Sequence, residues 1–280
     1  MNIKQYFKRG LRYIFRGVPE YHTTVEVQTV QPNALLKGRK IIITGGGKGL
    51  GFHIAKKSLA EGAEVLITGR NEETLKQAVE KLGCNAHYLV FDVRNIGDIE
   101  LFLNKAESIF NGEKIDSLVS NAGVSLHEGE FRNVTEKGWD LQMDTNLKGN
   151  FFLVKHFIEY LEKHEDKSGN IVVITSERAK RSDDIPYGLT KIATSSFIQC
   201  IAQKVITEGI RINGVGPGVT ASDMTGFTKD GNMYADWQVG KRIFMPEEVA
   251  EVVNFLLSNC SACISGEIIT CDQGRYIARW

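Results

Sequence analysis

A tyrosine and a lysine four positions apart form the first pair of side chains that could do chemistry. Tyr187 and Lys191 fall in one predicted helix, where residues four apart share a face and can meet. A free tyrosine has a pKa of about 10, so it exchanges protons poorly at neutral pH. A cation beside it stabilises the phenolate, and we therefore expect Lys191 to lower that pKa. The pair is a candidate proton donor and acceptor for a substrate oxygen.

A run of glycines is the second candidate, for binding rather than for chemistry. Residues 44–51 read Thr-Gly-Gly-Gly-Lys-Gly-Leu-Gly, after a β-branched run at 40–44 and before a helical pattern over 50–60. Glycine permits a tight turn and lets backbone N–H groups approach a pyrophosphate at a helix N-terminus. A glycine cluster alone also fits an ordinary flexible turn. Its place after the first strand of a β–α–β unit favours a dinucleotide site.

The elements that must position these groups alternate along the chain. The predicted strands are 40–44, 64–68, 87–91, 117–119, 170–174, 210–213 and 267–270. The predicted helices are 50–60, 72–82, 97–110, 137–164, 186–209 and 246–257. Seven buried strands interleaved with helices predict an α/β fold with a doubly wound, seven-stranded parallel sheet in a single domain.

That domain is expected to cover 36–276, with an N-terminal extension over 1–35 and a short tail over 277–280. One irregular stretch, about 219–240, is rich in Gly, Asp and Met and predicts a mobile lid rather than a second domain. Its apolar side chains could close over the substrate, or contact another subunit.

Composition excludes several classes of protein. The chain has 280 residues, with 34 basic and 34 acidic side chains, so its net charge of zero argues against nucleic acid as a partner. No apolar run approaches the roughly 18 residues of a membrane span. An odd count of 5 cysteines indicates reduced thiols and hence a cytoplasmic compartment. The lone Cys260-x-x-Cys263 favours ordinary packing, so we expect no metal site.

The neutral balance hides an asymmetric N-terminal arm. Residues 1–18 carry five basic side chains and no acid, and the basic positions recur every four residues opposite an apolar stripe. This pattern predicts a basic amphipathic helix followed by an extended segment to residue 35. Such a helix could pack in a dimer or tetramer, lie peripherally on an anionic membrane surface, or stay disordered.

The motifs together resemble the short-chain dehydrogenase/reductase family, in register over about 36–276. The shared patterns are TGxxxGxG at 44–51, Asn121-Ala122-Gly123, the YxxxK of Tyr187 and Lys191, and Pro217-Gly218. The resemblance implies a Rossmann fold, a homodimer or homotetramer, and a small carbonyl or alcohol substrate. It also implies a set of cofactor-binding residues: Gly45, Gly47, Lys48, Gly49, Leu50, Gly51, Arg70, Asp92, Val93, Asn121, Ala122, Gly123, Tyr187, Lys191, Pro217, Gly218, Thr220 and Ser222.

The resemblance further implies a catalytic tetrad of Asn146, Ser176, Tyr187 and Lys191. Tyr187 would exchange a proton with the substrate oxygen, and Ser176 would hydrogen-bond that oxygen. Lys191 would hold the nicotinamide ribose, and Asn146 would keep a water-linked proton relay in place. The hydride passes between nicotinamide and the carbonyl carbon, so the protein positions the reacting groups and polarises the carbonyl.

The end of the second strand indicates which nicotinamide cofactor is used. An acid there would bind the ribose hydroxyls of NAD, but this chain has Gly69 followed by Arg70. Arg70 could clamp a 2′-phosphate, with Lys48 as a second cation. We therefore predict NADP(H), while two solvated surface charges remain the alternative.

The segment between Ser176 and Tyr187 departs from the family pattern. It is about two residues short, and charged residues, Arg178 and Arg181 among them, replace the usual small ones. Thr175 is the alternative hydroxyl. Either arginine could pair with an anionic substrate, but pairing with Asp183 or Asp184, or solvation, is the favoured interpretation.

The sequence thus predicts an NADP(H)-dependent oxidoreductase acting on a carbonyl or secondary alcohol, with Tyr187 as acid and base. A 3-oxoacyl thioester reductase of the same family is one alternative. A nucleotide-bound regulator or scaffold that does not catalyse is another, kept open by the shortened segment before Tyr187.

Overall fold

The structure, a computed structural model, describes residues 33–227 and 231–276. The predicted amphipathic helix, most of the extended arm and the tail at 277–280 lie outside the described residues. So do three residues of the predicted lid, 228–230.

Seven parallel strands form one sheet in the order β3-β2-β1-β4-β5-β6-β7, which confirms the predicted fold. Strand β1 pairs with β2 on one side and with β4 on the other, so the connection direction reverses between β1 and β4. Ligands of doubly wound folds bind outside the carboxyl ends of strands at such a switch point. The strands are β1 Lys40–Thr44, β2 Glu64–Gly69, β3 Ala86–Val90, β4 Ser117–Ser120, β5 Gly169–Ile174, β6 Ile210–Pro217 and β7 Ile268–Cys271.

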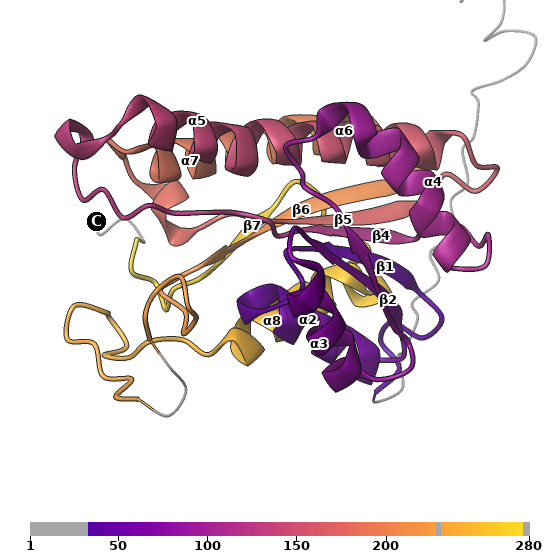
Figure 1. Ribbon diagram of the computed structural model, residues 1–280, viewed down its shortest axis with the longest axis horizontal. Helices are drawn as coiled ribbons and strands as arrows, with labels where there is room; N and C mark the ends of the chain where they lie inside the picture. Colours follow the sequence, from indigo (N-terminus) through magenta and orange to yellow (C-terminus); the bar gives the residue numbers. More distant parts are fainter. Residues whose placement is uncertain (1–32, 228–230, 277–280) are drawn as a thin grey trace, which may run out of the picture.

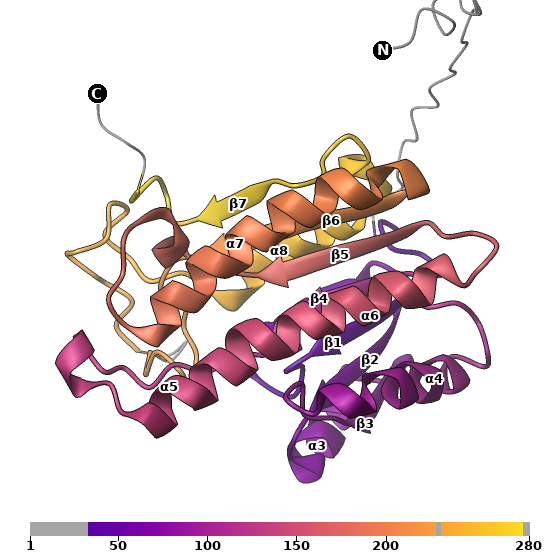
Figure 2. The ribbon, with the colours of Figure 1, turned by 90° about the horizontal axis from the view of Figure 1, so that it is seen from above.

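Helices cover both faces of the sheet, giving three layers (Figures 1 and 2). Helices α4, α5, α6 and α7 lie above the sheet in Figure 1, and α2, α3 and α8 lie below it. Each face has its own apolar core, and the strands are buried on both sides, which explains their continuous runs of Ile, Val and Leu. The helices are α2 Gly49–Ala60, α3 Glu72–Leu82, α4 Ile99–Ile109, α5 Glu136–Gln142, α6 Asn150–Glu162, α7 Pro186–Val205 and α8 Pro246–Leu257.

Two predicted elements differ from the structure. Strand β6 continues to Pro217, beyond its predicted end at 213, because its glycines are part of the strand. Gly214 and Gly216 pair with Ile268 and Thr270 of β7, so the ladder with β7 continues β6 to its end. The helix predicted over 137–164 is interrupted: a wide π-helical turn, Met143–Gly149, separates α5 from α6.

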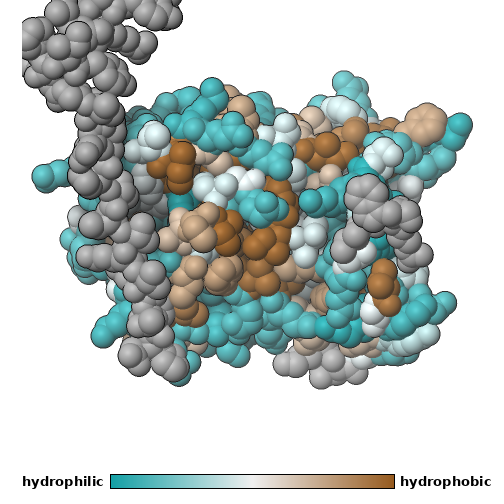
Figure 3. All heavy atoms as spheres, turned by 180° about the vertical axis from the view of Figure 1, so that it is seen from behind, coloured by the Kyte–Doolittle hydropathy of each residue, from teal (hydrophilic) through white to brown (hydrophobic). Residues whose placement is uncertain are grey.

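The edge of the sheet at β7 is open to one side of the molecule. Figure 3 shows that face, where apolar surface forms a band across its centre. Strand β7 is the last strand of the sheet. Half of its residues, Ile269 and Cys271, are only partly buried and pack against the apolar core between the sheet and α8. On α8, Phe255 is 38% exposed.

Candidate active site

One cavity of about 950 Å³ opens at the carboxyl ends of the strands. Its lining runs from the glycine loop after β1, past the loops after β2, β3, β4 and β5, to the first residues of the predicted lid. The structure brings to it every predicted cofactor residue. Of the four predicted catalytic residues, Ser176, Tyr187 and Lys191 line the cavity, and Asn146 lies behind its wall.

The glycine loop has the backbone shape that a pyrophosphate site needs. Gly45 and Gly49 have positive φ angles of 63° and 56°, which glycine adopts without strain. The amide of Asn121 holds the loop from β4, donating to the carbonyl oxygens of Thr44 at 2.8 Å and Gly45 at 3.2 Å. A Cβ on Gly51 would lie 2.3 Å from the Gly45 oxygen, so the helix start packs directly against the loop. These residues fit a dinucleotide at the N-terminus of α2.

Two exposed arginines lie at or next to the far end of the cavity. Arg70, after β2, lines the cavity. Arg94 does not line it but donates three side-chain hydrogen bonds to the Asp92 carboxylate, two at 3.0 Å and one at 2.6 Å. These hydrogen bonds lower the pKa of Asp92 below its ordinary value. Asp92 therefore stays ionised.

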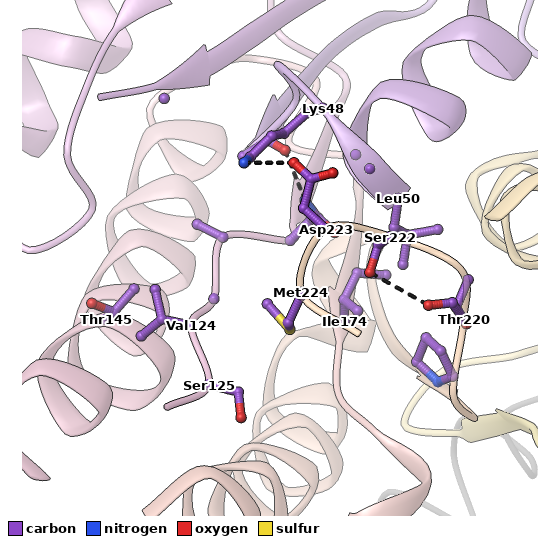
Figure 4. A pocket seen from close by; sticks show the side chains of 18 of the residues that line it. Lys48, Leu50, Val124, Ser125, Thr145, Ile174, Thr220, Ser222, Asp223 and Met224 are labelled. Carbon is purple, nitrogen blue, oxygen red and sulfur yellow. Dashed lines mark hydrogen bonds and ion pairs between the residues drawn. The ribbon is translucent and has the colours of Figure 1, made fainter. Parts of the chain in front are cut away.

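A lysine-carboxylate contact crosses the mouth of the cavity. Lys48 Nζ, at the start of α2, lies 2.8 Å from Oδ2 of Asp223 in the predicted lid (Figure 4). Both side chains are exposed, at 70% and 77%. Next to Asp223, Met224 lines the same cavity as Val124 and Ile174. Phe227 and Met233 pack instead in a small cluster of the lid itself, and Trp237 is exposed.

Tyr187, Lys191 and Ser176 meet at the other end of the cavity. Lys191 Nζ lies 5.6 Å from the centre of the Tyr187 ring and donates to the Ile174 carbonyl oxygen at 2.9 Å. Ser176 follows β5, and its hydroxyl interacts with the Tyr187 phenol. Thr175, the alternative hydroxyl, donates to the Val215 oxygen of β6 at 3.2 Å. Ser176 therefore occupies the position that faces Tyr187.

The protonation of this group differs from the expectation for the tyrosine. Burial raises the pKa of Tyr187, although the Ser176 hydroxyl and the Arg178 guanidinium oppose that rise. Burial also lowers the pKa of Lys191 to about 8. The expectation of a lowered tyrosine pKa is thus wrong for this structure, because desolvation outweighs the neighbouring cations. The phenol is therefore protonated at neutral pH.

Asn146 is held in the π-helical turn between α5 and α6. Its Oδ1 accepts from the Val124 N–H and its Nδ2 donates to the Val124 oxygen, both at 2.8 Å. Its side chain is fully buried, so it fixes the backbone after β4. A Cβ on Gly123 would lie 3.4 Å from Asn146 Oδ1 and 3.7 Å from Lys191 Nζ, which shows how close these groups are.

The short segment between Ser176 and Tyr187 is held by three acid-base pairs. Arg178 and Arg181 both pair with Asp183, whose side chain is 1% exposed. Glu177 lines the cavity and accepts from Arg275 at 2.8 Å. Burial raises the pKa of Glu177. The favoured interpretation of Arg178, pairing with Asp183, is confirmed.

Two contributors were missed in the sequence. Asp223 faces Lys48, and the Val124 backbone holds Asn146. The predicted partner of Arg178, Asp183, fits because the residue after Tyr187 is Gly188, where a Cβ would lie 2.0 Å from Asp183 Cγ. Among the described residues, no three His, Cys, Asp or Glu side chains gather to hold a metal ion. No helix in the described part of the chain is long and apolar enough to cross a membrane.

The fold and the cavity together define a doubly wound α/β protein of the dinucleotide-binding class. The sequence model of a family described as enoyl-(acyl carrier protein) reductase matches residues 45–275. The chain is 32% identical to a 3-oxoacyl-(acyl-carrier-protein) reductase of Chlamydia pneumoniae, over 85% of this chain and 97% of that protein. It is 29% identical to human dehydrogenase/reductase SDR family member 4, over 85% and 88%.

A solved structure has the same fold. The 3-ketoacyl-(acyl-carrier-protein) reductase from Brucella melitensis, complexed with NADH, superposes with a TM-score of 0.79 at 25% identity, covering 86% of this chain and 100% of that one. The chain therefore belongs to the short-chain dehydrogenase/reductase family. It is an oxidoreductase that uses a nicotinamide cofactor and a small-molecule carbonyl or alcohol, and members of this family are typically oligomeric.

Proposed function

We propose that the protein is an NADP(H)-dependent carbonyl reductase in which Tyr187 is the proton donor. One observation carries this proposal: Tyr187, Lys191 and Ser176 meet at one end of a cavity whose other end is the glycine loop. A nicotinamide cofactor bound along that cavity supplies the hydride. The reaction reverses to oxidise a secondary alcohol.

Each side chain has a separate task in this mechanism. The Ser176 hydroxyl donates a hydrogen bond to the substrate oxygen and so polarises the carbonyl. The Tyr187 phenol gives its proton to that oxygen as negative charge develops there. Lys191, close to the ring of Tyr187, offsets the negative charge that the phenolate then carries. Asn146 holds the Val124 backbone beside this group.

The names of the relatives favour one substrate class. Two of the similar proteins are described as reductases of 3-oxoacyl or 3-ketoacyl chains on acyl carrier protein. We propose a 3-oxoacyl compound as the substrate of this chain as well, with other carbonyl compounds as the alternative. A non-catalytic regulator would instead bind NADPH tightly without oxidising it in the presence of any ketone.

The same proposal covers the cellular compartment of the enzyme and its assembly into oligomers. The five cysteines are unpaired in the structure, which supports a reducing, cytoplasmic compartment. On the outer side of α6 and α7, Phe151 is 37% exposed and stacks edge-on against Phe197 at 5.6 Å between ring centres. This exposed aromatic pair supports assembly into a homodimer or homotetramer.

Tyr187→Phe tests the role of the tyrosine. The phenylalanine keeps the ring and removes the proton, so we expect kcat for reduction of a 3-oxoacyl thioester to fall by about 10²- to 10⁴-fold. The dissociation constant of NADPH, measured by its fluorescence, stays unchanged. Tyr88→Phe, far along the sheet on β3, is the control and keeps full activity. Full activity of Tyr187→Phe would refute the assignment.

Arg70→Ala tests the choice of NADP(H). Removing a guanidinium that holds a phosphate costs a charge-assisted contact, so we expect kcat/KM with NADPH to fall by roughly 10-fold or more. The value with NADH changes little. Arg132→Ala, an exposed arginine outside the cavity lining, is the matched control. An unchanged NADPH/NADH ratio would show that Arg70 is a solvated surface charge.

A further inference from the structure

Part of the Arg178 guanidinium has no hydrogen bond to any residue that the structure describes. It lies two residues after Ser176 and lines the cavity. Its guanidinium carbon is 6.0 Å from the centre of the Tyr187 ring, and 27% of its side chain is exposed. It therefore stands beside the group that would meet the substrate oxygen.

The buried Asp183 fixes the orientation of this guanidinium. Arg178 Nε and Nη2 donate to Asp183 at 2.5 and 2.7 Å, and the backbone N–H of Ile185 also donates to Asp183 Oδ1. Only glycine at 188 leaves room for that carboxylate. Asp183 occupies one edge of the guanidinium, and no hydrogen bond of Nη1 is found among the residues that the structure describes.

The charged groups around Arg178 make the edge that Asp183 does not occupy the one that can bind an acceptor. Glu177, the nearest other acid of the segment, is engaged by Arg275. Lys191 points its ammonium group to the Ile174 oxygen. Arg181 lies 3.8 Å from Asp183 but does not line the cavity. A guanidinium held along one edge loses little side-chain freedom when its other edge binds a carboxylate or carbonyl oxygen.

We propose that Arg178 is a specificity-determining residue that binds a second acceptor oxygen of the substrate, close to the carbonyl that is reduced. Substrates of this kind are 3-oxo acids and 3-oxoacyl thioesters, whose second oxygen is two carbons from the ketone. The inference rests on the proposed function and deepens it by naming what the substrate must carry. Asp183 and Gly188 are positioning residues, since they act through Arg178.

Equilibrium binding tests the proposal without depending on turnover. The full chain saturated with NADP⁺ is titrated with 3-oxobutanoate, with its N-acetylcysteamine thioester and with 2-pentanone, which lacks the second oxygen. We expect 3-oxobutanoate or its thioester to bind on the order of 10-fold or more tightly than 2-pentanone, as for a hydrogen bond to a charged group. A preference for the acid identifies a carboxylate as the ligand, and a preference for the thioester identifies a neutral carbonyl.

The variants then assign that preference to Arg178. In Arg178→Gln the ratio of dissociation constants falls to about one, while the matched control Arg181→Gln retains it. Because Arg178→Gln leaves a buried carboxylate, the double variant Arg178→Gln with Asp183→Asn is measured beside it, with NADP⁺ affinity and Tm as checks of the fold. A preference that survives in the folded double variant, or that wild type lacks, overturns the proposal. Failure of the proposed function is distinct: none of the three ketones would then support oxidation of NADPH.

Discussion

Lys191 is a buried cation without an acidic partner in the described structure. It is 4% exposed, and the contact of its ammonium group is a backbone oxygen, that of Ile174. Removing a charge from water without an opposite charge is costly, and the lowered pKa of about 8 is the sign of that cost. A residue kept at this expense is expected to serve function rather than stability.

Replacing this lysine should therefore separate stability from activity. We expect Lys191→Met to raise the free energy of unfolding at pH 7 by on the order of 2 kcal/mol, since the apolar side chain removes the desolvation cost. The same change lowers kcat by about 10²-fold or more, because no cation remains beside Tyr187. Urea unfolding and steady-state kinetics measure the two effects, and Lys204→Met in the last turn of α7 is the control. Loss of stability in Lys191→Met would contradict this account.

The same pKa gives a pH dependence with a definite sign. The folded pKa of about 8 lies below the ordinary 10.5 of lysine, so between these values the unfolded chain binds more protons than the folded one. The contribution of Lys191 to stability therefore becomes more favourable as the pH rises through that window. Reductive activity has the opposite trend, because Lys191 loses its charge above about pH 8.

At the scale of elements, the glycine loop depends on a close contact between the loop and the start of α2. An alanine inside a helix is normally more stable than glycine by about 1 kcal/mol. At Gly51 a Cβ would lie 2.3 Å from a backbone oxygen that cannot move aside, so the clash outweighs helix propensity.

Gly51→Ala should therefore displace the loop. We expect it to lower the affinity for NADPH by at least about 10-fold and to destabilise the fold by about 1–3 kcal/mol. Gly97→Ala is the matched control, because a Cβ there meets nothing within 4 Å. Fluorescence titration with NADPH and thermal unfolding give the two readings, and equal behaviour of both variants would refute the packing argument.

The sequence predicted the elements well where propensity and packing agree. Helix α3 begins at Glu72 and ends at Leu82 as predicted, since Asn71 caps its first turn and Gly83 follows its last. The errors fall where tertiary contacts decide. Gly214 lies in β6 because it pairs with Ile268 of β7, and the side chain of Asn146 in the π-helical turn bonds to the Val124 backbone from another loop.

The candidate site likewise has features that the sequence predicted and features that tertiary contacts decide. The sequence motifs predicted which residues form the site, because the glycines of the loop, Tyr187 and Lys191 are recognised by their spacing along the chain. The protonation of Tyr187 and the contact of Lys48 with Asp223 depend on burial and on contacts between distant segments, which spacing along the chain does not contain.

At the scale of the whole molecule, the chain is packed against the domain from the end of the arm onward. The Leu35 N–H donates to Glu61 Oε2 at 3.2 Å, and Leu36 is fully buried. We therefore expect a chain that begins at residue 35 to form the same sheet and cavity.

Deleting residues 1–34 tests the role of the basic arm. We expect the truncated protein to keep its kcat and to lose subunits, which mass measurement in solution detects. Unchanged mass together with lost binding to anionic liposomes would assign the arm to a membrane surface. No change in either property would show that the arm does neither. Full-length protein at the same concentration is the control.

The contact between Lys48 and Asp223 bears on the exchange of cofactor. It joins the start of α2 to the segment that follows β6, across the mouth of the cavity. Both side chains remain in water, so the pair can separate without disturbing either apolar core, and such exposed pairs contribute at most about 1 kcal/mol. We therefore expect this contact to open readily enough for dinucleotide to leave and enter the cavity.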